Sequence, residues 1–159
     1  MNLKIVKPFM IGAISAYGLA ALGLVVAANF GVLPVQADAI PSRLEAVVLG
    51  AALRASVTRH AMSVGNPLPP SEQNLIEGAK LYRQMCATCH GLSVESGNSY
   101  GQSFYPPAPN LLQRRTQYSD AQTFWIVKHG IRNTAMPAWG RLLSDGEIWQ
   151  VVTALRGDR

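Results

Sequence analysis

The sequence predicts an all-α protein in which a small helical domain follows a long apolar helix and a connecting amphipathic helix. Two observations predict this class. From Pro8 to Ala37, 30 residues contain no Asp, Glu, Lys, Arg or His, which exceeds the roughly 20 that a helix needs to cross a bilayer. Further along the chain, apolar residues recur at helical spacing behind N-cap serines, and no alternating strand pattern of useful length occurs.

Residues 1–37 form the predicted membrane anchor. Lys4 and Lys7 precede the apolar run, and positive flanks stay in the cytoplasm, so we expect a single-pass protein of the inner (cytoplasmic) membrane with its domain on the periplasmic side. A cleaved secretory signal is the alternative, because Val35-Gln36-Ala37 resembles a cleavage site. The apolar run is longer than the roughly 15 residues of a signal core, which favours the anchor.

Residues 38–71 are predicted to hold the amphipathic helix and a proline-rich linker. Ser42 followed by Glu45 is a capping-box pattern that opens a helix ending near Met62, before Gly65. This helix is either a spacer packed on the domain or a docking helix for a partner subunit. The prolines between Asn66 and Pro70 stop any helix and mark a domain boundary. The apolar residues at helical spacing are Leu44, Val47, Val48, Ala51 and Ala55.

Residues 72–159 are predicted to form the folded domain. Its 88 residues are few for an unaided hydrophobic core, so we expect a stabilising staple. The loop from Gly91 to Asn110, which contains three prolines, needs a rigid surface to lie against. Three helices are expected, from Ser71 to Thr88, from Ser119 to Gly130 and from Ser144 through Leu155.

The charge pattern excludes one class of partner. The net charge is +5, from 14 Lys and Arg against 9 Asp and Glu, but the basic residues are scattered apart from the pair Arg114-Arg115. A nucleic-acid surface needs clustered basic residues with stacking aromatic rings. We therefore expect no nucleic-acid binding.

The only two cysteines lie in Cys86-Ala87-Thr88-Cys89-His90, at the end of the first helix of the domain. This C-x-x-C-H run is the attachment signature of c-type haem. Thiols at i and i+3 share a helical face and can form thioethers to both vinyl groups of one porphyrin, while the adjacent imidazole ligates the iron. We therefore expect one haem c, attached through Cys86 and Cys89, with His90 as a metal ligand; it would supply the staple.

Three other uses of these residues fit less well. A thioredoxin-like redox pair begins a helix after a strand, whereas this motif ends a helix in a chain without strands. Zinc would need two further ligands, and the remaining histidines, His60 and His129, lie before the linker and after another helix. A structural disulfide would leave His90 unexplained.

The sixth iron ligand is predicted to be Met136, in Thr134-Ala135-Met136-Pro137. A thioether raises the iron potential, as expected for electron transfer, and the fixed φ of Pro137 stiffens the loop. The alternatives are a core methionine at 136 and His129 as the rival ligand.

These motifs resemble, in their order, those of the class I monohaem cytochromes c, specifically the membrane-anchored bacterial type. The resemblance covers essentially all of residues 72–159. The matching segments are Gly78-Ala79-Lys80-Leu81-Tyr82, Cys86 to Gly91, Pro106 to Leu111, Phe124 to Arg132, Met136 to Gly140 and Ser144 to Trp149.

The resemblance implies further roles. The first and last helices would cross at Gly78, with Tyr82 packing near Val151 and Leu155 of the last helix. The carbonyl of Pro109 would accept the Nδ1 hydrogen of His90. Leu111 would line the haem and Trp139 would lie near a propionate. Core packing is the alternative for Pro109, Leu111 and Trp139. The segment from Ser93 to Ser103 matches no motif of the family.

Electron transfer follows as the expected function. We expect a membrane-tethered electron carrier rather than an enzyme, with redox proteins as donor and acceptor, either shuttling on its anchor or fixed in a larger oxidoreductase complex. A haem enzyme or gas-binding sensor with a displaceable sixth ligand is the alternative, with His129 and Arg132 as distal candidates. A structural haem subunit that anchors a partner enzyme is a third reading.

Overall fold

The computed structural model describes residues 3–36, 38–61, 63, 65–94, 98–114 and 116–157. Every regular element within these ranges is helical, which confirms the all-α class. The chain divides into two compact units, 1–39 and 40–159, each of which is described by itself. Four expectations, on Ala37, Met62, Arg115 and the middle of the Ser93 to Ser103 segment (95–97), lie outside the described residues.

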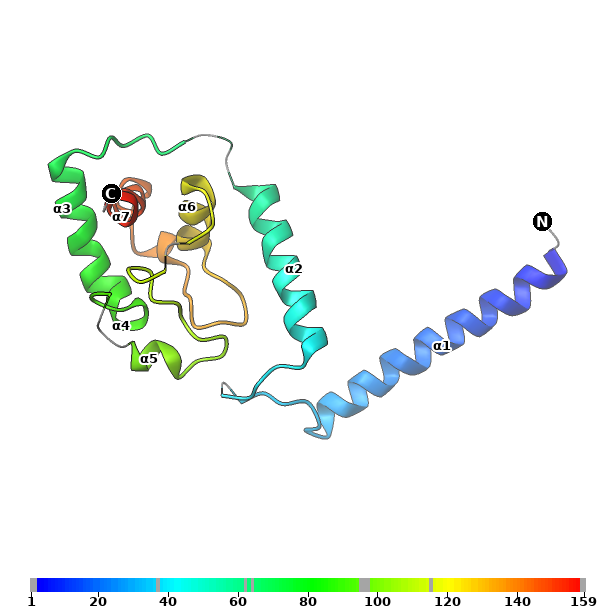
Figure 1. The fold of residues 1–159 in the computed structure, drawn as a ribbon. Coiled ribbons are helices and arrows are strands. Elements are labelled where there is room, and N and C mark those ends of the chain that lie inside the picture. The colour runs from blue at the N-terminus through cyan, green and yellow to red at the C-terminus, as the bar shows by residue number, and fades with distance from the viewer. Residues whose placement is uncertain are drawn as a thin grey trace. The chain divides into compact units, whose positions relative to one another are not determined.

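The first unit contains α1 (Leu3–Asn29). Its segment Lys7–Asn29 has 23 residues, none buried, and is long and apolar enough to cross a membrane; a helix of that length spans roughly 35 Å. A signal sequence meets the same criteria of length and composition. The sequence-based prediction of an apolar N-terminal helix is therefore confirmed (Figure 1).

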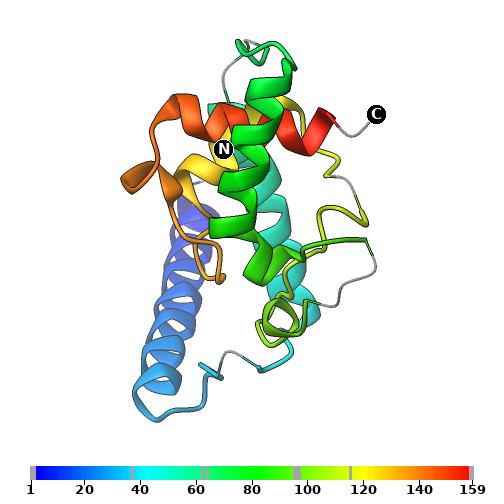
Figure 2. The same ribbon diagram turned by 90° about the vertical axis from the view of Figure 1, so that its left-hand side faces the viewer.

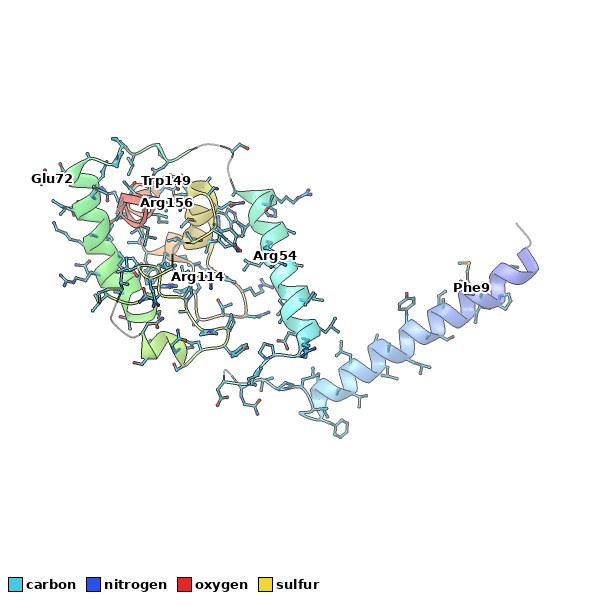
Figure 3. All side chains as sticks on the ribbon, viewed as in Figure 1. Phe9, Arg54, Glu72, Arg114, Trp149 and Arg156 are labelled. Atoms are coloured by element: carbon cyan, nitrogen blue, oxygen red, sulfur yellow. The ribbon has the colours of Figure 1, made fainter. Side chains whose placement is uncertain are left out.

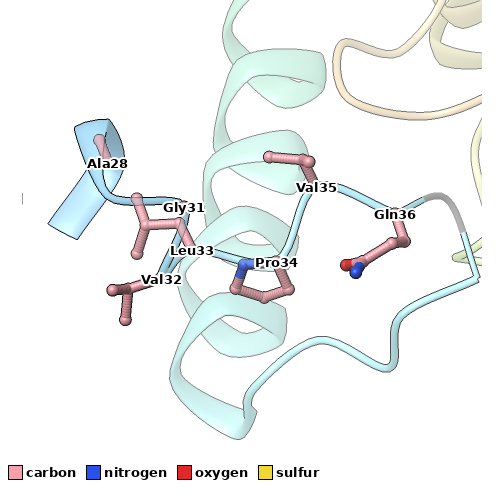
Figure 4. A pocket seen from close by; sticks show the side chains of 7 residues that line it. All are labelled: Ala28, Gly31, Val32, Leu33, Pro34, Val35 and Gln36. Carbon is pink, nitrogen blue, oxygen red and sulfur yellow. The ribbon is translucent and has the colours of Figure 1, made fainter.

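A Schellman motif ends α1. Gly31 has a φ of 68°, its N–H donates to the carbonyl of Ala28 at 3.4 Å, and the N–H of Val32 donates to the carbonyl of Ala27 at 3.0 Å. The turn and the residues after it, up to Gln36, surround a shallow pocket (Figure 4). The helix thus ends at a defined glycine before the connector begins.

The second unit begins with α2 (Arg43–His60). The Ser42 hydroxyl caps it by accepting from the Glu45 N–H at 3.2 Å. The helix contacts α6 (Asp120–His129). At this end of α2, Val57 is fully buried, and the His60 ring stacks on Trp125 with centroids 6.0 Å apart. The predicted amphipathic helix is therefore packed on the domain by one side.

The first helix of the domain runs without a break from Glu72 to His90. It comprises α3 (Glu72–Leu81), the π-helical turn η1 (Tyr82–Cys86) and α4 (Ala87–His90). Ser71 is the N-cap, as the sequence predicts. The π-helical turn was not expected from the sequence; such turns are rare and are frequently found at functional sites. It ends at the first cysteine, Cys86, three residues before Cys89.

The crossing of α3 over α7 (Asp145–Gly157) is the main helix contact of this unit (Figure 2). Gly78 lies at the crossing, where an added Cβ would overlap the carbonyl of Gln150 and come within 2.9 Å of the Ala154 Cβ. Only a residue without a side chain permits this backbone approach. The expected crossing at Gly78 is confirmed.

The core lies between α6, α7 and the loop that joins them. The rings of Phe124 and Trp149 stack with centroids 4.3 Å apart, and Ile148 and Val152 are fully buried. Capping boxes open both helices: Ser119 with Gln122, and Ser144 with Glu147. Figure 3 shows Trp149 and Arg156 on α7, and Arg156 forms an ion pair with Asp120 at 2.7 Å.

We predict that Gly78→Ala lowers the free energy of unfolding by about 3 kcal/mol, because the new methyl group must push α3 away from α7. Denaturant unfolding of the haem-loaded protein measures the effect. The control is Gly146→Ala in the first turn of α7, where the nearest atom is 4.0 Å away. That change should be neutral or stabilising by up to about 1 kcal/mol. Equal stability of the two variants would show that the crossing tolerates a side chain.

Candidate haem-binding site

Cys86 ends η1 and Cys89 lies in α4. Both are half-buried thiols with no disulfide between them. Burial, and to a lesser extent the charge of Cys89, raises the pKa of the Cys86 thiol to about 11. Redox-active cysteine pairs depend on a lowered thiol pKa, so this environment does not suit a thioredoxin-like pair. It is compatible with two thiols that are capped by covalent attachment.

The orientation of His90 is determined by one hydrogen bond. His90 Nδ1 lies 2.8 Å from the carbonyl oxygen of Pro109. Because a carbonyl oxygen can only accept, Nδ1 carries the hydrogen, and Nε2 is left as the basic nitrogen that can bind a metal. The hydrogen bond that the family resemblance implied is present in the structure.

Asn110 holds the loop that carries the Pro109 carbonyl. Its side-chain oxygen accepts from the N–H groups of Leu112 and Gln113, both at 3.0 Å, and its amide donates to the carbonyl of Ser93 at 3.0 Å. The N–H of Leu111 donates to the His90 carbonyl at 3.3 Å. These bonds tie residues 109–113 to the histidine, so the acceptor cannot drift away from Nδ1.

Residues of the segment from Ser93 to Ser103, which matched no family motif, pack against the C-x-x-C-H motif. It contains α5 (Ser99–Gln102). The amide of Asn98 donates to the carbonyls of Cys89 at 2.9 Å and Ala108 at 2.8 Å. Gly101 is buried so tightly that a Cβ there would overlap the Cys89 carbonyl. Sequence reasoning missed Asn98 and Gly101, because no local pattern shows which distant carbonyl an asparagine will meet.

Tyr82 fastens the end of the helix. Its hydroxyl donates to the carbonyls of Gly91 at 2.9 Å and His90 at 3.2 Å. Burial, followed by the charge of Cys86, raises the pKa of Tyr82 to about 12. The phenol therefore stays protonated at neutral pH and satisfies two carbonyls that α4 leaves without helical partners.

Met136 is half-buried and packs against the core cluster of α6 and α7. Its carbonyl accepts from the Ile131 N–H at 3.1 Å, and its N–H donates to the Thr134 hydroxyl at 3.1 Å. Gly130, with a φ of 67°, approaches this loop so closely that a Cβ would meet the Met136 oxygen at 2.7 Å. Gly130 was expected as a helix end, but its role in seating the Met136 loop was missed.

The remaining candidates lie elsewhere. His129 is exposed, with its ring 5.0 Å from that of Trp125, and Arg132 is also exposed. Trp139, in the 3-10 turn η2 (Trp139–Arg141), is partly buried against the core cluster, which is the packing alternative left open above. Leu111 is half-buried and lines an apolar pocket together with Ala79, Leu112 and Leu155.

The residues present fit a covalently attached haem. The thiols of Cys86 and Cys89 are separated by two residues at the end of a helix. The adjacent imidazole of His90 donates from Nδ1 to Pro109, which leaves Nε2 able to act as a ligand. Met136 supplies a thioether on a loop that is held by hydrogen bonds between the Met136 backbone and Ile131 and Thr134. This donor set matches the His/Met ligation of c-type cytochromes.

The family model described as cytochrome c oxidase, cbb3-type, subunit III matches residues 73–153, just over half of the chain. The chain belongs to this cytochrome c family. Its haem domain is a class I monohaem cytochrome c, a domain that implies covalent haem c and electron transfer. The matched range begins at the first turn of α3 and ends within α7, so it contains every candidate haem residue.

A chain of the reducing HAO-like protein complex of Kuenenia stuttgartiensis is similar in structure, with 24% sequence identity and a TM-score of 0.46. The match covers 59% of this chain and 48% of that one, so this cytochrome spans about half the length of that relative. No curated protein sequence matches the chain.

We predict that Gly130→Ala displaces the Met136 loop, because the φ of 67° and the 2.7 Å contact leave no room for a methyl group. The haem-loaded variant should lose the weak far-red absorption band that reports a Met–Fe(III) bond. It should also unfold at least about 2 kcal/mol more easily.

The control is Gly65→Ala, where nothing lies within 4 Å of the added Cβ. That variant should keep both the band and the stability. An unchanged band in Gly130→Ala would show that this glycine does not seat the ligand loop.

Proposed function

We propose that this cytochrome is a membrane-tethered one-electron carrier. Its haem c is attached through Cys86 and Cys89, and His90 and Met136 are the axial ligands. The observation that carries the proposal is the 2.8 Å hydrogen bond from His90 Nδ1 to Pro109, since it leaves Nε2 as the ligand atom. Two cysteines at the i and i+3 positions beside that imidazole support the attachment.

Haem c supplies a one-electron Fe(III)/Fe(II) couple when bound. The Pro109 carbonyl holds the His90 ring in one orientation and makes Nε2 more basic through Nδ1. The Met136 thioether favours a higher reduction potential. The Ile131 N–H donates to the Met136 carbonyl and the Met136 N–H donates to the Thr134 hydroxyl. These two hydrogen bonds hold the ligand loop in place as the charge changes, which keeps the structural reorganisation small.

Leu111 is the apolar side chain proposed for the haem environment, and it lines a pocket with Leu112 and Leu155. An apolar side chain that excludes water from the haem raises the cost of the extra charge on oxidised iron. We propose that Leu111 covers part of the haem. The exposed haem edge would then be the point at which redox protein partners dock.

The partners are proposed to be a membrane-associated donor and acceptor. The family model is described as subunit III of a cytochrome c oxidase. This description favours assembly with a larger oxidoreductase over a purely free shuttle. Extraction in mild detergent separates the two cases, since a shuttle leaves the membrane as a monomer and a fixed subunit co-purifies with its complex.

We predict that Met136→Ala keeps its covalent haem but loses the far-red Met–Fe(III) band. Its reduction potential should fall by a sizeable part of the roughly 0.8 V range that axial ligands span. Optical spectra and a redox titration of the purified holoprotein measure both effects. The variant should also bind CO readily, because one axial position is open.

The matched control is Met85→Ala, next to Cys86, where the side chain is partly exposed. It should keep the band and the potential. A band that survives in Met136→Ala would assign the ligand to another residue. Wild-type protein that lacks the band and binds CO at once would instead support a haem enzyme or gas-binding sensor.

We also propose that α1 is retained as an anchor, with the haem domain on the periplasmic side. We predict that the holoprotein stays in the membrane after alkaline carbonate washing and that its mass includes α1. Protease added to spheroplasts should digest the haem domain, while a cytoplasmic marker enzyme stays intact. A soluble periplasmic holoprotein that begins near residue 38 would contradict the anchor and establish a cleaved signal.

A further inference from the structure

Helix α2 has two apolar faces, one buried and one exposed. The inner face consists of Gly50, Leu53 and Val57, which are at least partly buried, and α2 contacts α6. Residues at i, i+3 and i+7 share one side of a helix. This inner face, with His60 on Trp125, accounts for the attachment of α2 to the haem domain.

The outer face is apolar as well, but it is exposed. We call it the outer stripe: Leu44, Val47, Val48, Ala51 and Ala55, all exposed. Leu44 is 74% exposed and Val47 is 66% exposed. At 100° per residue the centre of the stripe lies about 140° from the centre of the inner face. All five side chains are exposed, so the haem domain does not cover them. A helix that is apolar on both sides normally buries both.

The chain itself keeps this stripe close to the bilayer. Helix α1 ends at Asn29 and α2 begins at Arg43, so 13 residues connect them. Even fully extended, such a connector reaches roughly 45 Å. The connector is also apolar and exposed: Phe30 is 80% exposed, Val35 is 91% exposed and Ile40 is 79% exposed. The outer stripe thus continues a series of apolar residues that begins in the predicted membrane span.

The charges on α2 also favour a lipid surface as the partner of the outer stripe. Arg43, Arg54 and Arg59 are exposed on α2, against Glu45 as its one acidic residue (Figure 3 labels Arg54). The helical spacing puts the three arginines along the two borders of the outer stripe. Helices that lie in a membrane interface have this arrangement, with cationic heads reaching the lipid phosphates beside a buried apolar face.

We propose that the outer stripe of α2 lies in the interface of an anionic lipid bilayer. The cytochrome domain is then held against the membrane by α2 as well as by α1, and it meets partners only near the bilayer surface. The inference rests on the proposed anchoring by α1, because the tether brings the stripe to the lipid. A protein partner or a second copy of the chain would leave the arginine borders without phosphates to bind.

Two equally exposed leucines provide a direct test. Leu44 on the outer stripe and Leu142 outside α2 are both 74% exposed. Leu44→Cys and Leu142→Cys are prepared in the full-length holoprotein, where haem occupies Cys86 and Cys89 and leaves one thiol. Each variant is placed in phosphatidylglycerol-containing nanodiscs that hold one copy. The rate of modification by a water-soluble maleimide is then measured.

The thiol of Leu44→Cys should react several-fold more slowly than that of Leu142→Cys, because interfacial helices bury their apolar face roughly 5–10 Å into the lipid. Val48→Cys, on the same stripe, should be protected like Leu44→Cys. Equal rates at 44 and 142 would overturn the proposal. Protection seen in native membranes but not in single-copy nanodiscs would also overturn it, because a protein would then cover the stripe.

The proposed function fails in a different way. Loss of covalent haem, judged from the haem absorption of the denatured protein, would contradict the carrier proposal. Cys86 and Cys89 would then also react with the maleimide, so the rates at 44 and 142 are compared by mass spectrometry of the peptides that contain those two positions. A chain that leaves the nanodisc altogether would overturn both the anchor and the outer-stripe proposal. Equal rates in a haem-loaded chain that stays in the nanodisc overturn the outer-stripe proposal alone.

Discussion

The close approach of α3 and α7 at Gly78 is the contact on which the rest of the haem domain depends. The absence of a Cβ lets the α3 backbone reach the Gln150 carbonyl. Because η1 and α4 continue from α3, this crossing determines where both cysteines and His90 stand relative to the α6–α7 core. The Met136 loop is built on that same core. One contact between two backbones therefore relates the two proposed axial ligands, which lie 46 residues apart in the sequence.

Hydrogen bonds, rather than regular secondary structure, hold the surroundings of the C-x-x-C-H motif. Pro109 orients the histidine, Asn98 binds the carbonyl of the second cysteine, and the Tyr82 hydroxyl satisfies the carbonyls at the end of α4. Among the described residues, no buried side-chain N or O atom lacks a partner. Long loops can carry such a site because each loop is tied to the motif by a polar side chain, and unpaired groups there would be costly.

Helix α2 is proposed to be a second attachment of the haem domain to the membrane, besides α1. Val57 on its inner face packs on the domain, and the outer stripe is apolar and exposed. A carrier restricted to the bilayer surface searches for partners in two dimensions, which raises their effective concentration. In the proposed arrangement, α2 lies in the membrane interface and limits the orientations in which the haem edge can face a partner. A flexible linker could not limit these orientations.

Local signals in the sequence determined the long helices, though not η1, α5 or η2, and they indicate the proposed haem-binding residues. Serine caps at positions 42, 71, 119 and 144 and a glycine at 130 mark helix ends, because capping involves residues that are close together in the chain. The C-x-x-C-H motif is equally local. Tertiary structure alone decided that α2 packs on α6, that Asn98 and Gly101 support the carbonyl of Cys89, and that Gly130 seats the Met136 loop. Each of these contacts joins segments that are distant in sequence, and their partners are set by the way the helices pack rather than by any pattern within one segment.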